Sequence, residues 1–434
     1  MNTYIFWSAI AGLAVAFIGS GFKGKQTDQT IEDYFICRSS LKLGWLTLTI
    51  LATQLGGGAV IGAAETAYTS GWVGCFYSLG ICLGLLIMGI FVAPKLKTYN
   101  LMTMASVFGE VYQSRRLRTF SACLSVITLF FILVAIGVSC RKLFTYLGYD
   151  SPWILAGFWF VILGYTVMGG LRAVVITDAI QVIFILIVFS GIALYVTQMP
   201  DLKMTIVAYS PPENTDIRWT DWVLMPLCFM IISQDMGQRC FAAMDKTAIQ
   251  KGMIIGALVL MVASTVPVVI GILGAQTGIV SHSGSILMTV VENIFSPTMV
   301  SLIAISIIIA IVSTADSLLC AISSNISIDI MRNSSVLKSK GITFLIGVAA
   351  MMFSYSKSNV IPVMIIGYEI SVFALFIPFL MGLYKKPVTE KQALISIGVG
   401  GLFFILKKMA PFPGLEFLML IGCSLPYMFK KTIS

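Results

Sequence analysis

Long apolar runs, separated by short polar stretches, follow one another along almost the whole chain. A membrane-spanning helix needs about 20 mainly apolar residues. Segments of that kind lie at roughly 3–22, 43–67, 72–94, 118–145, 151–169, 174–197, 221–240, 250–276, 298–328, 340–356, 360–383, 391–408 and 412–429. Their apolar residues are continuous rather than alternating, which argues against a transmembrane barrel. The pattern predicts an all-α membrane protein of about 13 transmembrane helices.

The composition of the 434 residues supports this class, with 58% apolar and 11% charged residues. Soluble domains have about 45–50% apolar residues and roughly 25% charged residues. The single histidine, His282, excludes a multi-histidine metal site within one chain and offers no nucleophile–base constellation for an enzyme. The nine cysteines show no CxxC spacing, so we interpret them as small buried apolar residues. No segment is long enough for a separate soluble domain.

The positive charges indicate an orientation. With the N-terminus outside and the C-terminus in the cytoplasm, the inner segments hold 21 of the 28 Lys and Arg residues, as the positive-inside rule requires. Arg239 is counted among them, because we place it and Gln238 at the cytoplasmic end of their helix. The net charge of +9 is therefore a topology signal rather than a nucleic-acid footprint. We expect a plasma membrane (bacterial inner membrane) protein.

Two of the predicted helices contain interruptions. The first holds three consecutive glycines, Gly56, Gly57 and Gly58, each of which costs a helix about 1 kcal/mol relative to alanine. The second holds Pro226 and the polar stretch Ser233–Arg239. Close helix packing is the alternative explanation for the glycines. The interruptions lie five spans apart, as expected of two inverted five-helix repeats that each open with a broken helix.

Four acids lie within apolar segments, where ionisable groups are expensive and by default functional. They are Asp178, Asp235, Asp316 and Glu369. Asp316 shares helical faces with hydroxyl-bearing residues at 313, 314 and 317, and this oxygen-rich patch suits sodium. The alternative is that these hydroxyls bond back to their own helix. Glu369 either lines a substrate cavity or is a protonated structural residue. Asp235 is near the inner end of its span and open to solvation.

Four motifs in a fixed order resemble those of the sodium/solute symporter family. They are Glu32–Ser39, Ala52–Gly58 running on to Ala67–Gly71, Gly169–Gln181, and Ser313–Ser317 followed by Ser323–Asp329. Together they cover about residues 32–385, and their order is more specific than any one motif.

The resemblance implies a leucine-transporter-like fold with broken first and sixth core helices. Residues 1–42 would form an N-terminal extra helix and a cytoplasmic loop. Residues 43–197 and 198–383 would form the two inverted repeats, and residues 384–434 two extra C-terminal helices. It also implies alternating access driven by a sodium gradient.

The resemblance further assigns site residues. The main sodium site would use Ala52, Leu55, Ala310, Ser313 and Thr314. Some members carry a second sodium near the signature aspartate, which here would use Asp178 with Asp316 or Ser317. The substrate would lie at the helix breaks, near Gln54, Gly56, Gly57, Gly58, Ala59, Phe229, Met230 and Glu369.

We therefore expect a sodium-coupled symporter that imports a small polar organic solute, with an amino acid-like solute favoured. A quaternary ammonium substrate is the alternative, but Gln54 and Leu55 stand where choline-type relatives carry tryptophan. A proton-coupled transporter using Asp178 or Asp316, and a passive channel, also remain open. The expected partners are the solute, sodium ions and the lipid bilayer. No organic cofactor and no nucleic acid are expected, and the protein is expected to work as a monomer.

Overall fold

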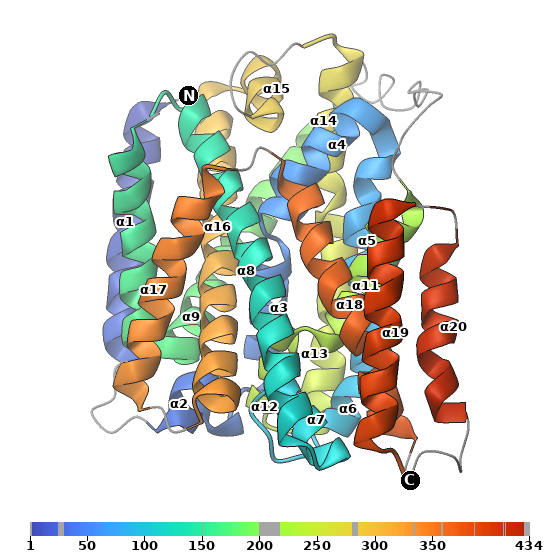
Figure 1. Ribbon diagram of the computed structural model, residues 1–434. Helices are drawn as coiled ribbons and strands as arrows, with labels where there is room; N and C mark the ends of the chain where they lie inside the picture. Colours follow the sequence, from blue (N-terminus) through green and yellow to red (C-terminus); the bar gives the residue numbers. More distant parts are fainter. Residues whose placement is uncertain are drawn as a thin grey trace.

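A bundle of long helices makes up the protein in the computed structural model (Figure 1). The structure describes residues 2–24, 30–149, 151–198, 218–279, 285–332, 335–356, 359–385, 387–410, 412 and 414–428. Within these ranges there is no β-strand, and one isolated bridge joins Leu41 to Ala243. The all-α prediction is therefore confirmed for the described part of the chain.

The helices of the N-terminal half run as far as residue 198. They are α1 (Thr3–Gly24), α2 (Ile31–Ile36), α3 (Leu43–Gln54), α4 (Ala63–Ser70), α5 (Phe76–Ile87), α6 (Ala93–Leu96), α7 (Met104–Tyr112), α8 (Arg115–Tyr146) and α9 (Pro152–Gln198). Short π-helical segments, Gly58–Gly62 and Met88–Val92, precede α4 and α6.

The C-terminal half contributes the remaining helices. They are α11 (Met225–Ile232), α12 (Gln234–Ala242), α13 (Lys246–Ala263), α14 (Thr265–Gln276), α15 (Ile286–Ile294), α16 (Pro297–Ser324), α17 (Val336–Ser354), α18 (Val360–Tyr384), α19 (Glu390–Met409) and α20 (Leu415–Met428). A π-helical segment, Thr220–Leu224, leads into α11, and another, Asn325–Ile330, extends α16.

Each predicted span is mostly helix over its described residues, but neighbouring spans sometimes run on from one another. The expected pair 151–169 and 174–197 forms α9, in which two helical segments meet at a kink at Gly170. Gly170 has φ 56°, and a Cβ there would lie 2.5 Å from the backbone oxygen of Tyr34, so only glycine fits. In the described ranges, nine helices are long and apolar enough to cross a membrane, so the count of 13 remains a prediction.

Both predicted interruptions are real breaks in the helices. α3 ends at Gln54, the chain turns at Leu55 (φ −79°, ψ 47°), and helix resumes at Gly58. In the second half, Ser233 is extended (ψ 139°) and separates α11 from α12. Unwound backbone at membrane depth is tolerated only inside protein or beside a cavity. The surroundings of these two breaks are therefore the place to look for a site.

Burial separates the central helices from the peripheral ones. In the most apolar stretches of α16 and α18, 83% of the residues are buried. In those of α1, α17 and α19, the share is 22%. α16 packs against α3, α8 and α9, and α18 packs against α8 and α11. At the edges of the bundle, α1 lies on α9, and α20 lies on α19 (Figure 1). The two breaks thus lie beside the most deeply buried helices.

Candidate ion and substrate sites

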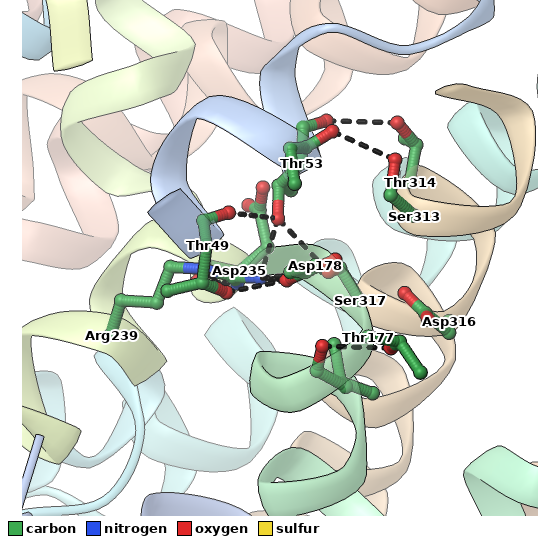
Figure 2. Close-up of polar contacts among 12 residues, drawn as sticks. Thr49, Thr53, Thr177, Asp178, Asp235, Arg239, Ser313, Thr314, Asp316 and Ser317 are labelled. Atoms are coloured by element: carbon green, nitrogen blue, oxygen red, sulfur yellow. Dashed lines mark hydrogen bonds and ion pairs between the residues drawn. The ribbon is translucent and has the colours of Figure 1, made fainter. Parts of the chain in front are cut away.

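The break in α3 meets α16 through a group of neutral oxygen atoms. The Ser313 hydroxyl donates to the Ala52 carbonyl oxygen, and the Thr314 hydroxyl donates to the Thr53 carbonyl oxygen, both at 2.9 Å. The same two hydroxyls lie 3.1 and 3.2 Å from the carbonyl oxygen of Ala310. All five residues are buried. We call these five oxygens the oxygen cluster; Figure 2 shows Thr53 facing Ser313 and Thr314.

Four of the five residues predicted for the main sodium site are therefore together in the oxygen cluster. The fifth, Leu55, is fully buried at the turn that ends α3. Thr53 is an addition, because the sequence did not show which carbonyl would face Thr314. The serine and threonine hydroxyls bond both across to α3 and back to their own helix, so both of the interpretations offered for them apply.

The three glycines of the break face three different helices. A Cβ on Gly56 would collide with the Thr314 hydroxyl, and one on Gly57 would collide with Ser139 of α8. A Cβ on Gly58 would lie 2.8 Å from the sulfur of Met364 in α18. The break is therefore both an unwound segment and a point of close packing. Gly56 is the glycine that lets the oxygen cluster form.

A second polar cluster lies next to the first and contains formal charges. Asp178 accepts a hydrogen bond from the Thr49 hydroxyl at 2.5 Å and pairs with the Arg239 guanidinium at 3.4 Å. Arg239 also donates to the hydroxyls of Thr53 and Ser317, the latter at 2.7 Å. We call these five residues the guanidinium cluster (Figure 2).

The position of Arg239 corrects the sequence interpretation. Arg239 and Gln238 were placed at a cytoplasmic helix end, but both are completely buried. After the break at Ser233, α12 runs beneath α3 rather than out of the bundle, and Gln238 donates to the carbonyl oxygen of Phe35 at 2.6 Å. The sequence of a polar run does not show whether its side chains are exposed to water or are buried against an acid.

Asp316 lies beside the guanidinium cluster without joining it. Its Oδ2 accepts a hydrogen bond from the Tyr165 hydroxyl at 2.5 Å. In the described part of the chain, Oδ1 of Asp316 and Oδ1 of Asp178 have no hydrogen-bond partner, and the two carboxylates are close enough for their charges to interact. With both acids ionised, they and Arg239 would carry a net charge of −1, which is costly inside a membrane protein.

The two helix breaks meet at one small cavity of about 20 Å³. It is lined by Thr53, Gln54, Gly56, Gly58, Ala59, Tyr77, Ile132, Phe229, Met230, Asp235, Thr314, Leu318, Met364 and Tyr368. All of these residues are buried. The cavity is far smaller than the roughly 300–1,000 Å³ of small-molecule sites, so its lining residues must move apart to admit a solute.

Six of the eight predicted substrate residues line this cavity, and two lie elsewhere. Gly57 faces α8, as described above. Glu369 pairs with Lys407 at 2.8 Å and with Lys408 at 2.7 Å. Lys407 also pairs with Glu416 and Asp221. The structure therefore places Glu369 in a charged clamp between α18 and the peripheral helices, because the face of α18 that carries it points towards α19.

Asp235, Tyr77 and Tyr368 are among the lining residues that were not predicted for the substrate. Asp235 was expected near solvent, but it is 3% exposed and lies opposite Gln54. The hydroxyls of Tyr77 and Tyr368 are hydrogen-bonded to each other at 2.8 Å. Tyrosines inside apolar segments carry no sequence signal for a site, because they are equally common in helix packing. The sequence showed an acid within a span at position 235, but it did not show that this acid is buried.

Comparisons with known proteins agree with this arrangement. Residues 34–400 match the model of the Sodium:solute symporter family. The chain is 26% identical to a sodium/pantothenate symporter of Escherichia coli (strain K12) over 93% of this chain and 90% of that protein. It is 29% identical to the high-affinity proline transporter PutP of Bacillus subtilis (strain 168) over 37% of this chain and 36% of that protein.

The fold is also that of a solved symporter. A substrate-bound, outward-open structure of a Na⁺-coupled sialic acid symporter superposes with a TM-score of 0.76, at 20% sequence identity, over 99% of this chain and 98% of that one. At this identity the likeness concerns the fold, which is leucine-transporter-like with two broken helices. The predicted leucine-transporter-like fold is therefore confirmed, while the repeat boundaries and the count of 13 helices stay predictions.

Proposed function

The chain belongs to the sodium:solute symporter family, and from this premise we propose that it imports a small, amino acid-like solute together with sodium by alternating access. Sodium-coupled symport of a small solute in the plasma membrane follows from the family and the relatives, as does the absence of an enzymatic role. The solute class, the ion sites and the direction in the membrane are our proposal.

The oxygen cluster is the observation that carries the sodium assignment. Unwound backbone carbonyls at a broken helix are typical sodium ligands in this type of fold. Here carbonyls of Ala52 and Thr53 on α3 lie against the hydroxyls of Ser313 and Thr314 on α16. A sodium ion bound there would be coordinated by these oxygens, together with Leu55 and Ala310. It would join the broken helix α3 to the buried helix α16.

We propose a second sodium at the unpartnered carboxylate oxygens of Asp178 and Asp316. The residues fit a cation, since two buried acids and one arginine leave a net charge of −1 and two oxygens without donors. Ser317, which already bonds to Arg239, adjoins the same place. The sodium ion would neutralise the negative charge that Arg239 leaves uncompensated on Asp178 and Asp316.

Solute and ions then move together. Sodium entering from outside closes the α3 break around the solute in the cavity, and rocking of one repeat against the other opens the site inwards. The repeats are residues 43–197 and 198–383, with the N-terminus outside and the C-terminus in the cytoplasm. Each sodium contributes roughly 2.3 kcal/mol per 100 mV of membrane potential, which supports strong accumulation.

Proton coupling is the second candidate, and the same unpartnered carboxylates favour it. A proton on Asp178 or Asp316 would neutralise the net charge as a second sodium would. The two candidates differ in their response to sodium at fixed pH. A passive channel would differ from both, because it cannot accumulate solute against a gradient.

The test uses ²²Na⁺ uptake into proteoliposomes, at fixed pH, in the presence of each L-amino acid, choline and pantothenate in turn. We expect one class of solute to stimulate ²²Na⁺ entry. The double variant Ser313→Ala, Thr314→Ala removes two ligands and should raise the half-saturating sodium concentration roughly ten- to a hundredfold.

Ser306→Ala is the matched control. Ser306 is also buried on α16, but its hydroxyl bonds only to Leu302 of its own helix, at 2.9 Å. It should leave the sodium response unchanged. An unchanged half-saturating sodium concentration in the double variant would remove the main-site assignment. Uptake that follows a proton gradient and ignores sodium would replace sodium coupling with proton coupling.

A further inference from the structure

One carboxylate lines the cavity directly after the second helix break. Among the described residues that line it, Asp235 alone carries a charge. Asp235 lies in the first turn of α12, directly after the break at Ser233, and is 3% exposed. The positive end of a helix favours an ionised carboxylate at that position. The N-terminal end of α12 therefore offsets part of the cost of burying a negative charge at Asp235.

In the part of the chain that the structure describes, this carboxylate forms no ion pair, although the charge of Arg239 reaches it. Its Oδ2 accepts a long hydrogen bond, 3.4 Å, from the Gln54 amide, and its Oδ1 accepts none. Arg239 lies one turn further along α12, but its Nη1 donates to the backbone oxygen of Asp235, at 2.9 Å. The other donors of Arg239 point into the guanidinium cluster.

Aromatic rings lie on the same cavity. Phe229 stacks on Tyr368 with 4.4 Å between ring centroids, and Tyr77 stacks on the same ring at 6.3 Å. The two tyrosine hydroxyls bond to each other. Ring faces attract a positive charge. A carboxylate and three rings without a basic side chain form a site for a cation rather than for an anion.

We propose that Asp235 binds a protonated primary or secondary amine of the transported solute, so that the substrate class is amino acids and related amines. The N–H donor is required because Asp235 Oδ1 is a buried acceptor without a partner, and a quaternary ammonium has no N–H to give it. The carboxylate of an amino acid would lie at the other break, against the positive N-terminal end of the helix that starts at Gly58. This assignment deepens the proposed symport function and rests on it.

The assignment distinguishes this chain from two of its relatives. The named solutes of the pantothenate and sialic acid symporters are carboxylates without a basic amine. Such an anion would meet the buried carboxylate of Asp235 with no cation to offset it, which is strongly unfavourable. Proline, the named solute of another relative, carries a secondary ammonium.

The experiment measures thermal stabilisation of the purified full-length protein in NaCl and in KCl. The probes are the L-amino acids, the amines and 2-oxo acids that match them, choline and pantothenate. We expect stabilisation by one or more probes with an N–H ammonium and none by their 2-oxo counterparts or pantothenate. Asp235→Asn should weaken the binding of that probe roughly ten- to a hundredfold. Asp235→Glu, which keeps the charge, should lose less.

Glu110→Gln is the control, since Glu110 is an exposed acid on α7, away from the cavity, and its change should alter no affinity. Stabilisation by pantothenate or a 2-oxo acid alone, or by no amine at all, overturns the assignment. So does an Asp235→Asn protein that folds and binds the amine as tightly as the wild type. If Asp235→Asn does not fold, the wild-type panel and Asp235→Glu decide.

The same measurements separate this assignment from the proposed function. Amine binding that is equally strong in KCl keeps the role of Asp235 and contradicts sodium coupling. Sodium-dependent binding of an anion alone keeps sodium coupling and contradicts the role of Asp235.

Discussion

The oxygen cluster and the guanidinium cluster share Thr53 but differ in charge: the first has no charged group, and the second contains its own cation. Through its backbone carbonyl, Thr53 belongs to a group of neutral oxygens without a formal charge. Through its hydroxyl, it belongs to a group that already contains a cation, the guanidinium of Arg239. Neutral oxygens hold a cation without neutralising it, which suits an ion that must leave again. A charged pair between α9 and α12 instead holds helices together.

The contact at Thr53 also links the two helix breaks. Arg239 belongs to α12, which follows the second break, whereas Thr53 lies just before the first. A shift of the end of α3 on sodium binding would therefore move the acceptor of an Arg239 hydrogen bond. A sodium ion at the proposed site would in this way be mechanically connected to the helix that carries Asp235.

The largest expected effect comes from Arg239→Gln. The change leaves Asp178 buried and without its cation, which typically costs about 3–5 kcal/mol. We expect the free energy of unfolding to fall by that amount in detergent denaturation measured in KCl. Asp178→Asn combined with Arg239→Gln should recover part of the loss, because the uncompensated charge is gone. A loss below about 1 kcal/mol would mean that the pair is not a structural element.

A smaller effect, specific to sodium, is expected at the glycines. Gly56→Ala places a Cβ against the Thr314 hydroxyl, whereas Gly57→Ala places one against Ser139. Overpacking costs about 1–3 kcal/mol at either site. Only Gly56→Ala should also raise the sodium concentration for half-maximal thermal stabilisation, by roughly tenfold. Equal sodium responses in the two variants would show that the oxygen cluster does not bind the ion.

The sequence predicted the features that have a local signal. Apolar runs of sufficient length predicted the helices, and Gly56–Gly58 predicted the first break, because three glycines disfavour a helix wherever they occur. Ser313 and Thr314 were found because hydroxyls inside an apolar helix are unusual. These signals depend on the residues themselves and on their spacing, so no knowledge of the neighbouring helices was needed.

The features that were missed depend on packing between distant segments. Arg239 and Asp235 lie in a polar run whose sequence is compatible with water, and only the path of α12 beneath α3 shows that they are buried. Glu369 was noticed as an acid in a span, but its lysine partners are on α19, nearly 40 positions away.

Glu369→Gln tests the separation between the cavity and the charged clamp on α18. The change removes the charge that pairs with Lys407 and Lys408, while Lys407 keeps Asp221 and Glu416. We expect a loss of about 1–2 kcal/mol in unfolding free energy. The sodium response and the solute affinity should not change, as measured by thermal shift. A tenfold change in solute affinity would return Glu369 to the substrate site.

The smallest expected effect on stability comes from Asp316→Asn, and it bears most directly on the guanidinium cluster. The amide oxygen of the asparagine can still accept the Tyr165 hydrogen bond, so stability in KCl should be nearly unchanged. The change removes one of the two negative charges that face Arg239, and with it the net charge that a second sodium would neutralise. Since a Hill coefficient is limited by the number of sites, that of sodium-dependent uptake should fall from about 2 to about 1. Asn325, also buried but bonded to Ser125, offers a matched polar control as Asn325→Ser. If Asp316→Asn keeps the wild-type sodium stoichiometry, the second site is removed, and Arg239 is then the one cation that the acids at 178 and 316 need.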